Sequence, residues 1–358
     1  MKVLFVSNDP KIFHATSAVR ERMRAYAVAL GLPAQAGELH IVSAALPGAR
    51  EVHDGPLHLY PVHGSGLFRF KALVWRAHQL IRHEQIEVIS AQDPFEYGLA
   101  AWKAALFTKA RLHIQLHTDP FAPGFAHVGH TMSYINYARL LVMPFVLRRA
   151  ARIRVVSARL KDEIERRYHP SAPISMLPIY ADLSRFRAAR RLPERGLLVW
   201  VGRFEAEKDP LLALDALAAA RAAGVDARLT MLGAGRLEAA LKARATQLGF
   251  DAFVEFPGFA DPLPYLARAE LLLATSEYEG YGLAIIEALA AGVPVLSTDV
   301  GVAREAGAVI ADRVSYATTL ITLLRQGPPQ PSPIRDPYPS FAVYVSAYVA
   351  DIRACLEK

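Results

Sequence analysis

Residues 271–297 read LLLATSEYEGYGLAIIEALAAGVPVLS and predict a strand, a glycine-containing loop, a helix and a second strand. The opening apolar run suits a strand covered on both faces, as in a parallel sheet. Gly280 and Gly282 mark the loop. The helix that begins at Leu283 stops before Gly292, a residue type common just beyond helix C-termini. Strand, helix and strand in this order form one right-handed crossover unit of an α/β domain.

The same alternation runs along the whole chain and restarts near residue 197. The sequence therefore predicts the α/β class, with two doubly wound, Rossmann-like domains that face each other across a cleft. We expect an N-terminal domain over 1–182, a polar linker over 183–196 and a C-terminal domain over 197–335. Residues 336–358 predict a last helix that packs back on the N-terminal domain. The expected strands are Lys2–Ser7, His40–Ser43, Val88–Ala91, Leu112–Leu116, Ile153–Val156, Ile174–Leu177, Leu197–Val201, Arg228–Leu232, Val254–Phe256, Glu270–Ala274, Val295–Ser297 and Ala308–Ile310.

Composition and charge narrow the class of protein. Of the 358 residues, 53% are hydrophobic and 21% charged, which favours large cores over disorder. The first residues predict a buried strand rather than a signal peptide. The single Cys355 excludes an intramolecular disulfide and fits a reducing cytoplasm. Residues 1–190 hold 25 Lys and Arg against 14 Asp and Glu, whereas residues 191–358 hold 16 against 20. The first half therefore suits an anionic partner, although a solvated basic face without a partner gives the same pattern.

The glycine-containing loop predicts an anion site. Backbone N–H groups at a helix N-terminus attract anions, and glycine lets a phosphate approach the backbone. In the loop, the carboxylate of Glu279 suits the hydroxyls of a sugar. Within the helix, Glu287 lies among apolar residues and needs hydrogen-bond partners such as a ribose diol, unless it points to solvent. The loop brings four residues to the helix start: Gly280, Tyr281, Gly282 and Leu283.

A second loop carries two cations. Residues 202–210 read GRFEAEKDP and follow the predicted strand that opens the C-terminal domain. From this loop, Arg203 and Lys208 could hold a diphosphate from the side opposite the helix start and stabilise it as it leaves. They could instead pair at the surface with Glu205 and Glu207.

Four segments together resemble the C-terminal half of glycosyltransferase family 4. They are Gly202-Arg203 with Lys208, the Gly-Ala-Gly of residues 233–235, the Phe-Pro-Gly of residues 256–258 and EGYGLAIIEALAAGVPV over residues 279–295. The family is retaining and has the GT-B fold, and its Glu-x7-Glu motif corresponds to Glu279 and Glu287. The resemblance implies that Arg203 and Lys208 hold the donor diphosphate, Glu279 contacts the transferred sugar and Glu287 binds the ribose. Further donor-site residues implied are Gly202, Gly233, Gly258 and Phe259.

The N-terminal half resembles the family less closely. Residues 8–17 lack the glycine pair that often follows the first strand, and residues 176–182 lack the usual Pro-Asn-Gly. The run 112–119 resembles the family's strand that ends in histidine, which implies a catalytic position for His117; a lone histidine is more often structural. Asp-Pro pairs follow three strands and predict capped turns at strand ends. The acceptor-side candidates are Asp9, Lys11, His14, Asp93 and Asp119.

The resemblance implies transfer of a hexosyl group from a UDP- or GDP-linked sugar to an acceptor hydroxyl with retained configuration. Synthesis of cell-envelope polysaccharide, lipopolysaccharide or glycolipid is the expected setting. We expect no cofactor besides the donor and no metal, because no Asp-x-Asp motif lies on a strand-end loop. The alternatives are a nucleotide-sugar epimerase or a phosphorylase on the same fold, or a non-catalytic subunit that binds sugar nucleotides.

The expected partners are the nucleotide-sugar donor and a sugar or lipid-linked acceptor. Residues 68–76 and 143–154 mix apolar and cationic side chains, which suits an anionic membrane surface, although core helices with a basic outer face give the same pattern. We expect no nucleic acid, since no interleaved aromatic platform accompanies the charge. The protein is expected in the cytoplasm, including the inner face of the cell membrane.

Overall fold

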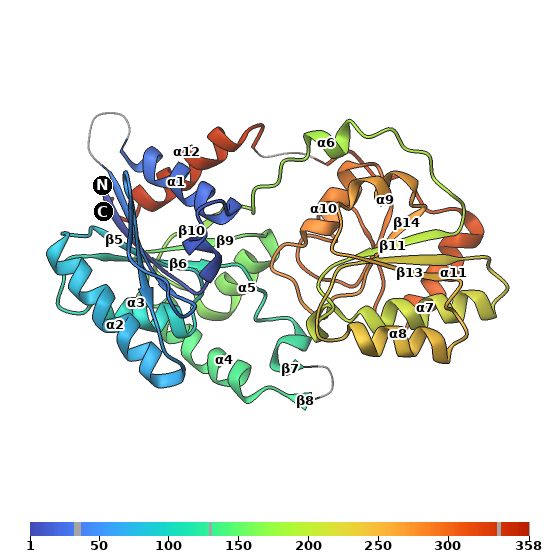
Figure 1. The fold of residues 1–358 in the computed structure, drawn as a ribbon, viewed down its shortest axis with the longest axis horizontal. Coiled ribbons are helices and arrows are strands. Elements are labelled where there is room, and N and C mark those ends of the chain that lie inside the picture. The colour runs from blue at the N-terminus through green and yellow to red at the C-terminus, as the bar shows by residue number, and fades with distance from the viewer. Residues whose placement is uncertain (32–36, 129–130, 335–337, 358) are drawn as a thin grey trace. The chain divides into compact units, whose positions relative to one another are not determined.

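A computed structural model describes residues 1–31, 37–128, 131–334 and 338–357 (Figure 1). The chain forms two compact units. The first comprises Met1–His117, Ile135–Tyr180 and Tyr338–Lys358, and the second comprises Thr118–Tyr134 and Ala181–Pro337. The change between units near residue 180 is close to the boundary expected at residue 182. Residues 118–134, expected in the N-terminal domain, belong to the second unit.

The first unit is built on an eight-stranded sheet with the order β10-β9-β6-β5-β1-β2-β4-β3. Adjacent strands are parallel, except that β3 runs antiparallel to β4. The strands are β1 (Lys2–Ser7), β2 (Glu38–Ala44), β3 (Val52–Asp54), β4 (Leu57–Val62), β5 (Val88–Ala91), β6 (Arg111–Leu116), β9 (Arg152–Val155) and β10 (Ile174–Met176). Six of them confirm predicted strands; β3 and β4 were not predicted.

Helices cover this sheet, and the C-terminal helix is one of them. It packs beside the first helix, where the rings of Tyr26 and Tyr348 stack with centroids 4.4 Å apart. Apolar side chains such as Phe5 and Ile41 complete this core cluster. The helices are η1 (Pro10–Phe13), α1 (Ala18–Leu30), α2 (Gly66–His83), α3 (Glu96–Ala105), α4 (Tyr134–Leu147), α5 (Ala158–Tyr168) and α12 (Phe341–Arg353).

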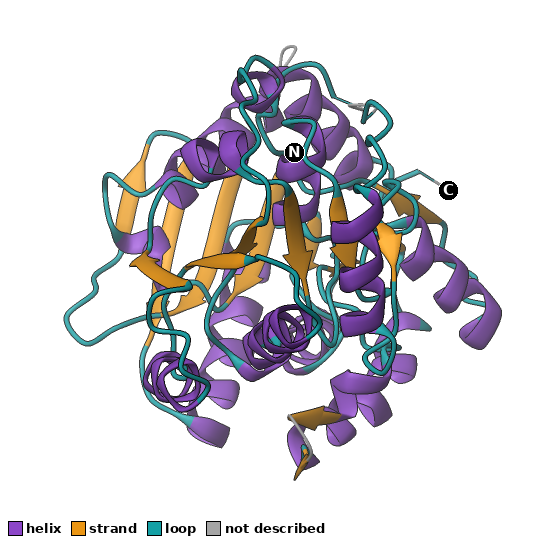
Figure 2. Cartoon of the chain, turned by 90° about the vertical axis from the view of Figure 1, so that its right-hand side faces the viewer, coloured by secondary structure: helices purple, strands orange, loops and turns teal. Residues whose placement is uncertain are grey.

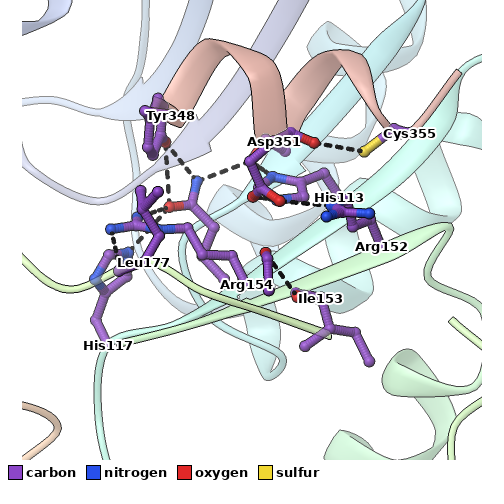
Figure 3. Close-up of polar contacts among 12 residues, drawn as sticks. His113, His117, Arg152, Ile153, Arg154, Leu177, Tyr348, Asp351 and Cys355 are labelled. Atoms are coloured by element: carbon purple, nitrogen blue, oxygen red, sulfur yellow. Dashed lines mark hydrogen bonds and ion pairs between the residues drawn. The ribbon is translucent and has the colours of Figure 1, made fainter. Parts of the chain in front are cut away.

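A buried carboxylate joins α12 to the sheet (Figure 3). Asp351 accepts a hydrogen bond from Arg152 Nε at 2.5 Å and another from His113 Nε2 at 3.1 Å. Burial raises the pKa of Asp351, but hydrogen bonds from His113 and Arg152 outweigh it and hold the pKa well below its usual range. The carboxylate is therefore charged at neutral pH and ties the last helix to β6 and β9.

The second unit has a six-stranded parallel sheet with the order β13-β12-β11-β14-β15-β16. Figure 2 shows strands with helices on either side. Its strands are β11 (Leu197–Val201), β12 (Arg228–Leu232), β13 (Val254–Gly258), β14 (Leu271–Ala274), β15 (Val295–Ser297) and β16 (Val309–Ile310), all close to predicted ones. Its other elements are η2 (Pro123–Ala126), β7 (His127–Val128), β8 (Thr131–Met132), α6 (Ser184–Arg187), η3 (Ala206–Lys208), α7 (Pro210–Ala222), α8 (Glu238–Gln247), α9 (Leu263–Arg268), α10 (Leu283–Ala290) and α11 (Tyr316–Gln326).

The order of strands in the second unit reverses between β11 and β14. From β11 the chain adds β12 and β13 on one side, and then crosses to add β14, β15 and β16 on the other. The loops after β11 and β14 therefore leave adjacent strand ends in opposite directions. Open parallel sheets bind their ligands at such a point.

Candidate active site

The loops after β11 and β14 are held together by hydrogen bonds. The hydroxyl of Thr275 donates to the carbonyl of Lys208 at 2.9 Å and accepts from Trp200 Nε1 at 2.9 Å. A second contact joins the same two loops, because the N–H of Glu277 donates to the carbonyl of Glu207 at 2.8 Å. The two loops that the sequence singled out thus form one backbone platform at the switch point of the sheet.

A lysine and a glutamate meet on this platform. Lys208 forms an ion pair with Glu279, and both side chains are mostly buried, at 20% and 19% exposure. The hydroxyl of Ser276 donates to the same carboxylate oxygen of Glu279 at 3.0 Å. The predicted partner cation, Arg203, is 71% exposed and pairs with Glu207 at 2.7 Å. In the structure Lys208 therefore pairs with Glu279. Arg203 instead forms a surface pair with Glu207, the arrangement predicted from the sequence as the alternative to a diphosphate contact.

Three glycines at neighbouring strand ends allow the backbone to pack closely. Gly233 has φ near +147°, and a Cβ there would lie 1.8 Å from the carbonyl oxygen of Gly202. The N–H of Gly233 donates to the carbonyl of Gly258 at 2.8 Å. Since no side chain fits at Gly233, the ends of β11, β12 and β13 approach one another more closely than other residues allow. Phe259, the residue after Gly258, is almost fully exposed.

The start of α10 offers backbone donors. Gly282 is the N-cap residue with φ near +99°, a conformation that suits glycine, and it provides no capping side chain. Within the described part of the chain, the N–H groups of Leu283 and Ala284 have no acceptor. Buried Gly280 and partly buried Tyr281 precede them in the loop. These N–H groups and the positive end of the helix dipole can bind an anion.

Glu287 lies one turn into α10 and is half-buried. Burial raises the pKa of this carboxyl, Arg185 opposes the rise and Asp261 adds to it. Arg185 itself pairs with Asp261 at 2.9 Å. No hydrogen-bond donor to Glu287 is found among the described residues. A carboxylate that is desolvated without a donor is typical of a ligand-binding position.

His117 follows β6 in the first unit (Figure 3). Burial, followed by the charge of Arg154, lowers the pKa of His117 to about 3, so the ring is neutral at pH 7. Its Nε2–H donates to Gln115 Oε1 at 3.2 Å, and the same oxygen accepts from Arg154 Nη1 at 2.6 Å. This arrangement assigns the proton to Nε2 and makes Nδ1 the acceptor.

The three aspartates of the acceptor-side set cap turns, as the Asp-Pro pairs predicted. In each case the carboxylate accepts from the N–H two residues further on, at 3.0 Å for Asp9, 2.7 Å for Asp93 and 2.8 Å for Asp119. Burial, followed by the charge of Glu96, raises the pKa of Asp93 to about 6. The other two candidates, Lys11 and His14, are exposed. An acceptor role for these five residues stays a prediction.

The structure adds one cation that the sequence did not single out. Arg313, in the loop after β16, forms an ion pair with Asp209 and lies 3.5 Å from Glu277. Because its partner Asp209 is about a hundred residues away in the chain, no local pattern could have revealed it. Arg313 holds the end of the Lys208 loop against the loop after β14.

Known proteins share this fold. Sucrose-phosphate synthase from Thermosynechococcus elongatus superposes with a TM-score of 0.70 at 16% identity, covering 100% of this chain and 94% of that one. A lipopolysaccharide outer core galactosyltransferase gives a TM-score of 0.65 at 15% identity, with 99% of each chain covered. The fold is therefore that of the GT-B glycosyltransferases, as expected.

Family comparisons narrow this class further. A family described as Glycosyltransferase Family 4 matches residues 23–185, and one described as Glycosyl transferases group 1 matches residues 195–326. The chain belongs to glycosyltransferase family 4. A GDP-mannose-dependent alpha-(1-6)-phosphatidylinositol dimannoside mannosyltransferase of Mycobacterium tuberculosis is 39% identical over 133 residues, 34% of each protein. The match thus spans about a third of that relative's length.

Proposed function

We propose that this protein is a retaining glycosyltransferase that moves a hexosyl group from a UDP- or GDP-linked sugar to an acceptor hydroxyl. The observation that carries the proposal is the meeting of Lys208 and Glu279 beside the open N-terminus of α10, at the switch point of the second sheet. A cation, a carboxylate and backbone N–H groups at one point match the needs of a sugar diphosphate.

Each group has a separate task in this proposal. Breakage of the bond between the sugar carbon and the diphosphate oxygen leaves the electron pair on the diphosphate. Lys208 and the N–H groups of Leu283 and Ala284 would offset that charge. Glu279 would accept hydrogen bonds from sugar hydroxyls, and a ribose diol would donate to the desolvated carboxylate of Glu287. We propose that these groups suffice without a metal ion.

His117 suits hydrogen bonding better than proton abstraction. Because burial lowers its pKa to about 3, the ring is a weak base at neutral pH. Its Nε2–H is engaged by Gln115, so Nδ1 can accept a hydrogen bond from a hydroxyl. We propose that His117 orients a sugar hydroxyl.

We further propose a lipid-linked or sugar acceptor of the cell envelope, reached at the inner face of the membrane. The phosphatidylinositol dimannoside mannosyltransferase to which this chain is similar supports this class. In the first unit, α2, α3 and α4 line an apolar cavity of about 490 Å³, with Arg69 and Arg139 among its lining residues. Exposed apolar side chains flank it, including Phe68 on α2 and Leu141 on α4. Among the described residues, no helix is both long and apolar enough to cross a membrane.

Liposome flotation tests the membrane surface. We expect the protein to float with vesicles that contain anionic lipid and to float less in the Phe68→Ser variant, because an exposed aromatic ring anchors at the lipid interface. A matched control is Phe107→Ser, at a fully exposed ring outside the cavity. No flotation of the wild type with vesicles that contain anionic lipid, nor with vesicles that lack it, would exclude the membrane proposal.

The transfer proposal is tested by incubation with UDP- and GDP-linked hexoses and candidate glycolipid acceptors. We expect release of nucleoside diphosphate only with an acceptor, and a product whose anomeric configuration, read by NMR, equals that of the donor. An epimerised sugar from donor alone would support the epimerase alternative. Donor binding without turnover on any acceptor would support the non-catalytic alternative, and an inverted product would exclude retention.

A further inference from the structure

Four side chains of the types that bind metal ions lie on one face at the edge of the eight-stranded sheet. Glu38 and His40 are two residues apart on β2 and therefore point to the same face. His58 on β4 lies directly opposite His40, and His53 on β3 lies directly opposite His58. Strand register, rather than chain proximity, thus brings one carboxylate and three imidazoles together.

The distances are close to those of a metal site. His40 Nε2 lies 3.1 Å from Glu38 Oε2, and the ligand atoms of Glu38, His40 and His58 all lie within 4.8 Å of one another. A tetrahedral zinc ion with bonds of about 2.1 Å places its ligand atoms about 3.4 Å apart. Side-chain rotations that move these atoms by roughly 1 Å would therefore complete the geometry.

Two polar side chains outside this ligand set, those of Tyr60 and His53, orient the imidazoles of His40 and His58. The hydroxyl of Tyr60 lies 3.1 Å from Nδ1 of buried His40, which leaves Nε2 of that ring facing Glu38. Nδ1 of His53 lies 2.9 Å from Nδ1 of His58. Metal-binding histidines usually have such a partner on the nitrogen that does not bind the metal.

We propose that Glu38, His40 and His58 bind a zinc ion, or another borderline divalent transition metal, with water in the fourth position. Two neutral imidazole nitrogens and one carboxylate oxygen are a donor set that such ions prefer. His53 and Tyr60 are positioning residues. The site ties β2 to the β3–β4 hairpin and closes the sheet edge.

This site is separate from sugar transfer. Glu38 and His40 lie in the first half of β2, whereas ligands of parallel sheets bind beyond the carboxyl ends of strands. The proposed metal therefore binds apart from the site of sugar transfer, and its presence or absence is independent of the proposed donor site in the second unit.

One neighbour competes with the metal. Lys2 Nζ lies 2.8 Å from Glu38 Oε2 and 3.6 Å from Glu84. The ammonium can keep its pair with Glu84 when the metal takes Glu38. Removal of the competing charge by Lys2→Met should therefore tighten metal binding.

Calorimetric titration of Zn²⁺ into the full-length, chelator-treated protein tests the proposal. We expect one equivalent to bind and to raise the melting temperature, because binding to the folded state alone stabilises it. Co²⁺ should give the intense visible bands of a four-coordinate ion. Tyr60→Phe should weaken binding about tenfold, the loss typical of an outer contact.

Two variants with matched side chains separate this site from adventitious binding. His58→Gln should lose the Zn²⁺ equivalent, whereas His63→Gln, at an exposed histidine just beyond β4, should retain it. Glu38→Gln keeps the shape of the carboxylate and should also lose tight binding, which guards against a His58 variant that fails to fold. The proposal is overturned if the wild type binds no Zn²⁺, or if His58→Gln and Glu38→Gln bind it as tightly as the wild type. In either case the rings of His40 and His58, with centroids 4.8 Å apart, are only a stacked pair.

Discussion

Replacement of Asp351 with Asn removes the charge from a carboxylate that is only 4% exposed. Asp351 accepts from both Arg152 Nε and His113 Nε2. The other nitrogen of His113, Nδ1, lies 2.8 Å from the hydroxyl of Ser90, which can donate to it and keep the proton on Nε2. The asparagine can accept from one partner only, because its amide NH₂ must face the other donor.

The expected loss in the free energy of unfolding follows from the burial of the Asp351–Arg152 ion pair. Loss of one partner from a buried ion pair costs about 3–5 kcal/mol. Arg152 is 22% exposed and keeps some hydration, so we expect the lower end, about 3 kcal/mol. At a urea dependence of about 2 kcal/mol per molar, the midpoint of unfolding falls by about 1.5 M.

Urea unfolding followed by circular dichroism measures this change, and hydrogen exchange of α12 amides locates it in the first unit. Asp162→Asn is the matched control, because Asp162 is exposed on α5 of the same unit. It should change the free energy of unfolding by less than about 0.5 kcal/mol. An Asp351→Asn variant as stable as this control would refute the reasoning.

The same carboxylate sets a dependence on pH. Its pKa is depressed in the folded protein, so its contribution is present above the ordinary aspartate pKa of 3.8 and is lost as the pH falls toward the depressed value. Between pH 4 and pH 2 the wild type should therefore lose more stability than Asp351→Asn. Parallel curves for the two proteins would contradict the assigned pKa direction.

Three further predictions concern the second unit. Lys208→Ala should lower the transfer rate at least about 100-fold, the loss typical of one preorganised charge-stabilising group, whereas exposed Lys242→Ala should not change it. Glu287→Gln should weaken donor binding yet leave the protein as stable or more stable at pH 7, because the raised pKa means that ionisation opposes folding as the pH rises; urea unfolding with and without donor measures both effects. Gly233→Ala should cost at least about 2 kcal/mol in the same unfolding assay, since its Cβ would lie 1.8 Å from a carbonyl oxygen, whereas Gly249→Ala, with open space around it, should cost about 1 kcal/mol.

Most of the parallel framework could be predicted from the sequence. Buried runs such as Leu197–Val201 and Leu271–Ala274 are apolar throughout, and the glycine loop before Leu283 marks the start of α10. β3 and β4 were missed because the partly exposed stretch 52–62 alternates histidine, proline and charge without a clean apolar run. β3 is the edge strand of the sheet and is partly solvated, so its hydrophobic signal is weak, whereas β4 is mostly buried but its apolar run is interrupted by His58 and Pro61.

The sequence predicted individual residues of the candidate site, but it did not predict which of them form ion pairs with one another. The loop sequences indicated both Lys208 and Glu279, but the cation chosen with Lys208, Arg203, lies in a surface pair with Glu207. Glu207, four residues after Arg203 in the chain, competes with partners from distant segments for the arginine, and only the fold shows which pair forms. Arg313 shows the opposite case, since it reaches the loops from a distant segment that carries no motif.

Titration of UDP, GDP and their hexose derivatives into the wild-type protein tests the central claim most directly. The account predicts one site per chain for at least one of these sugar nucleotides, with binding weakened in both Lys208→Ala and Glu287→Gln and unchanged in Lys242→Ala. The absence of binding by every nucleotide, or binding that neither Lys208→Ala nor Glu287→Gln alters, would contradict it.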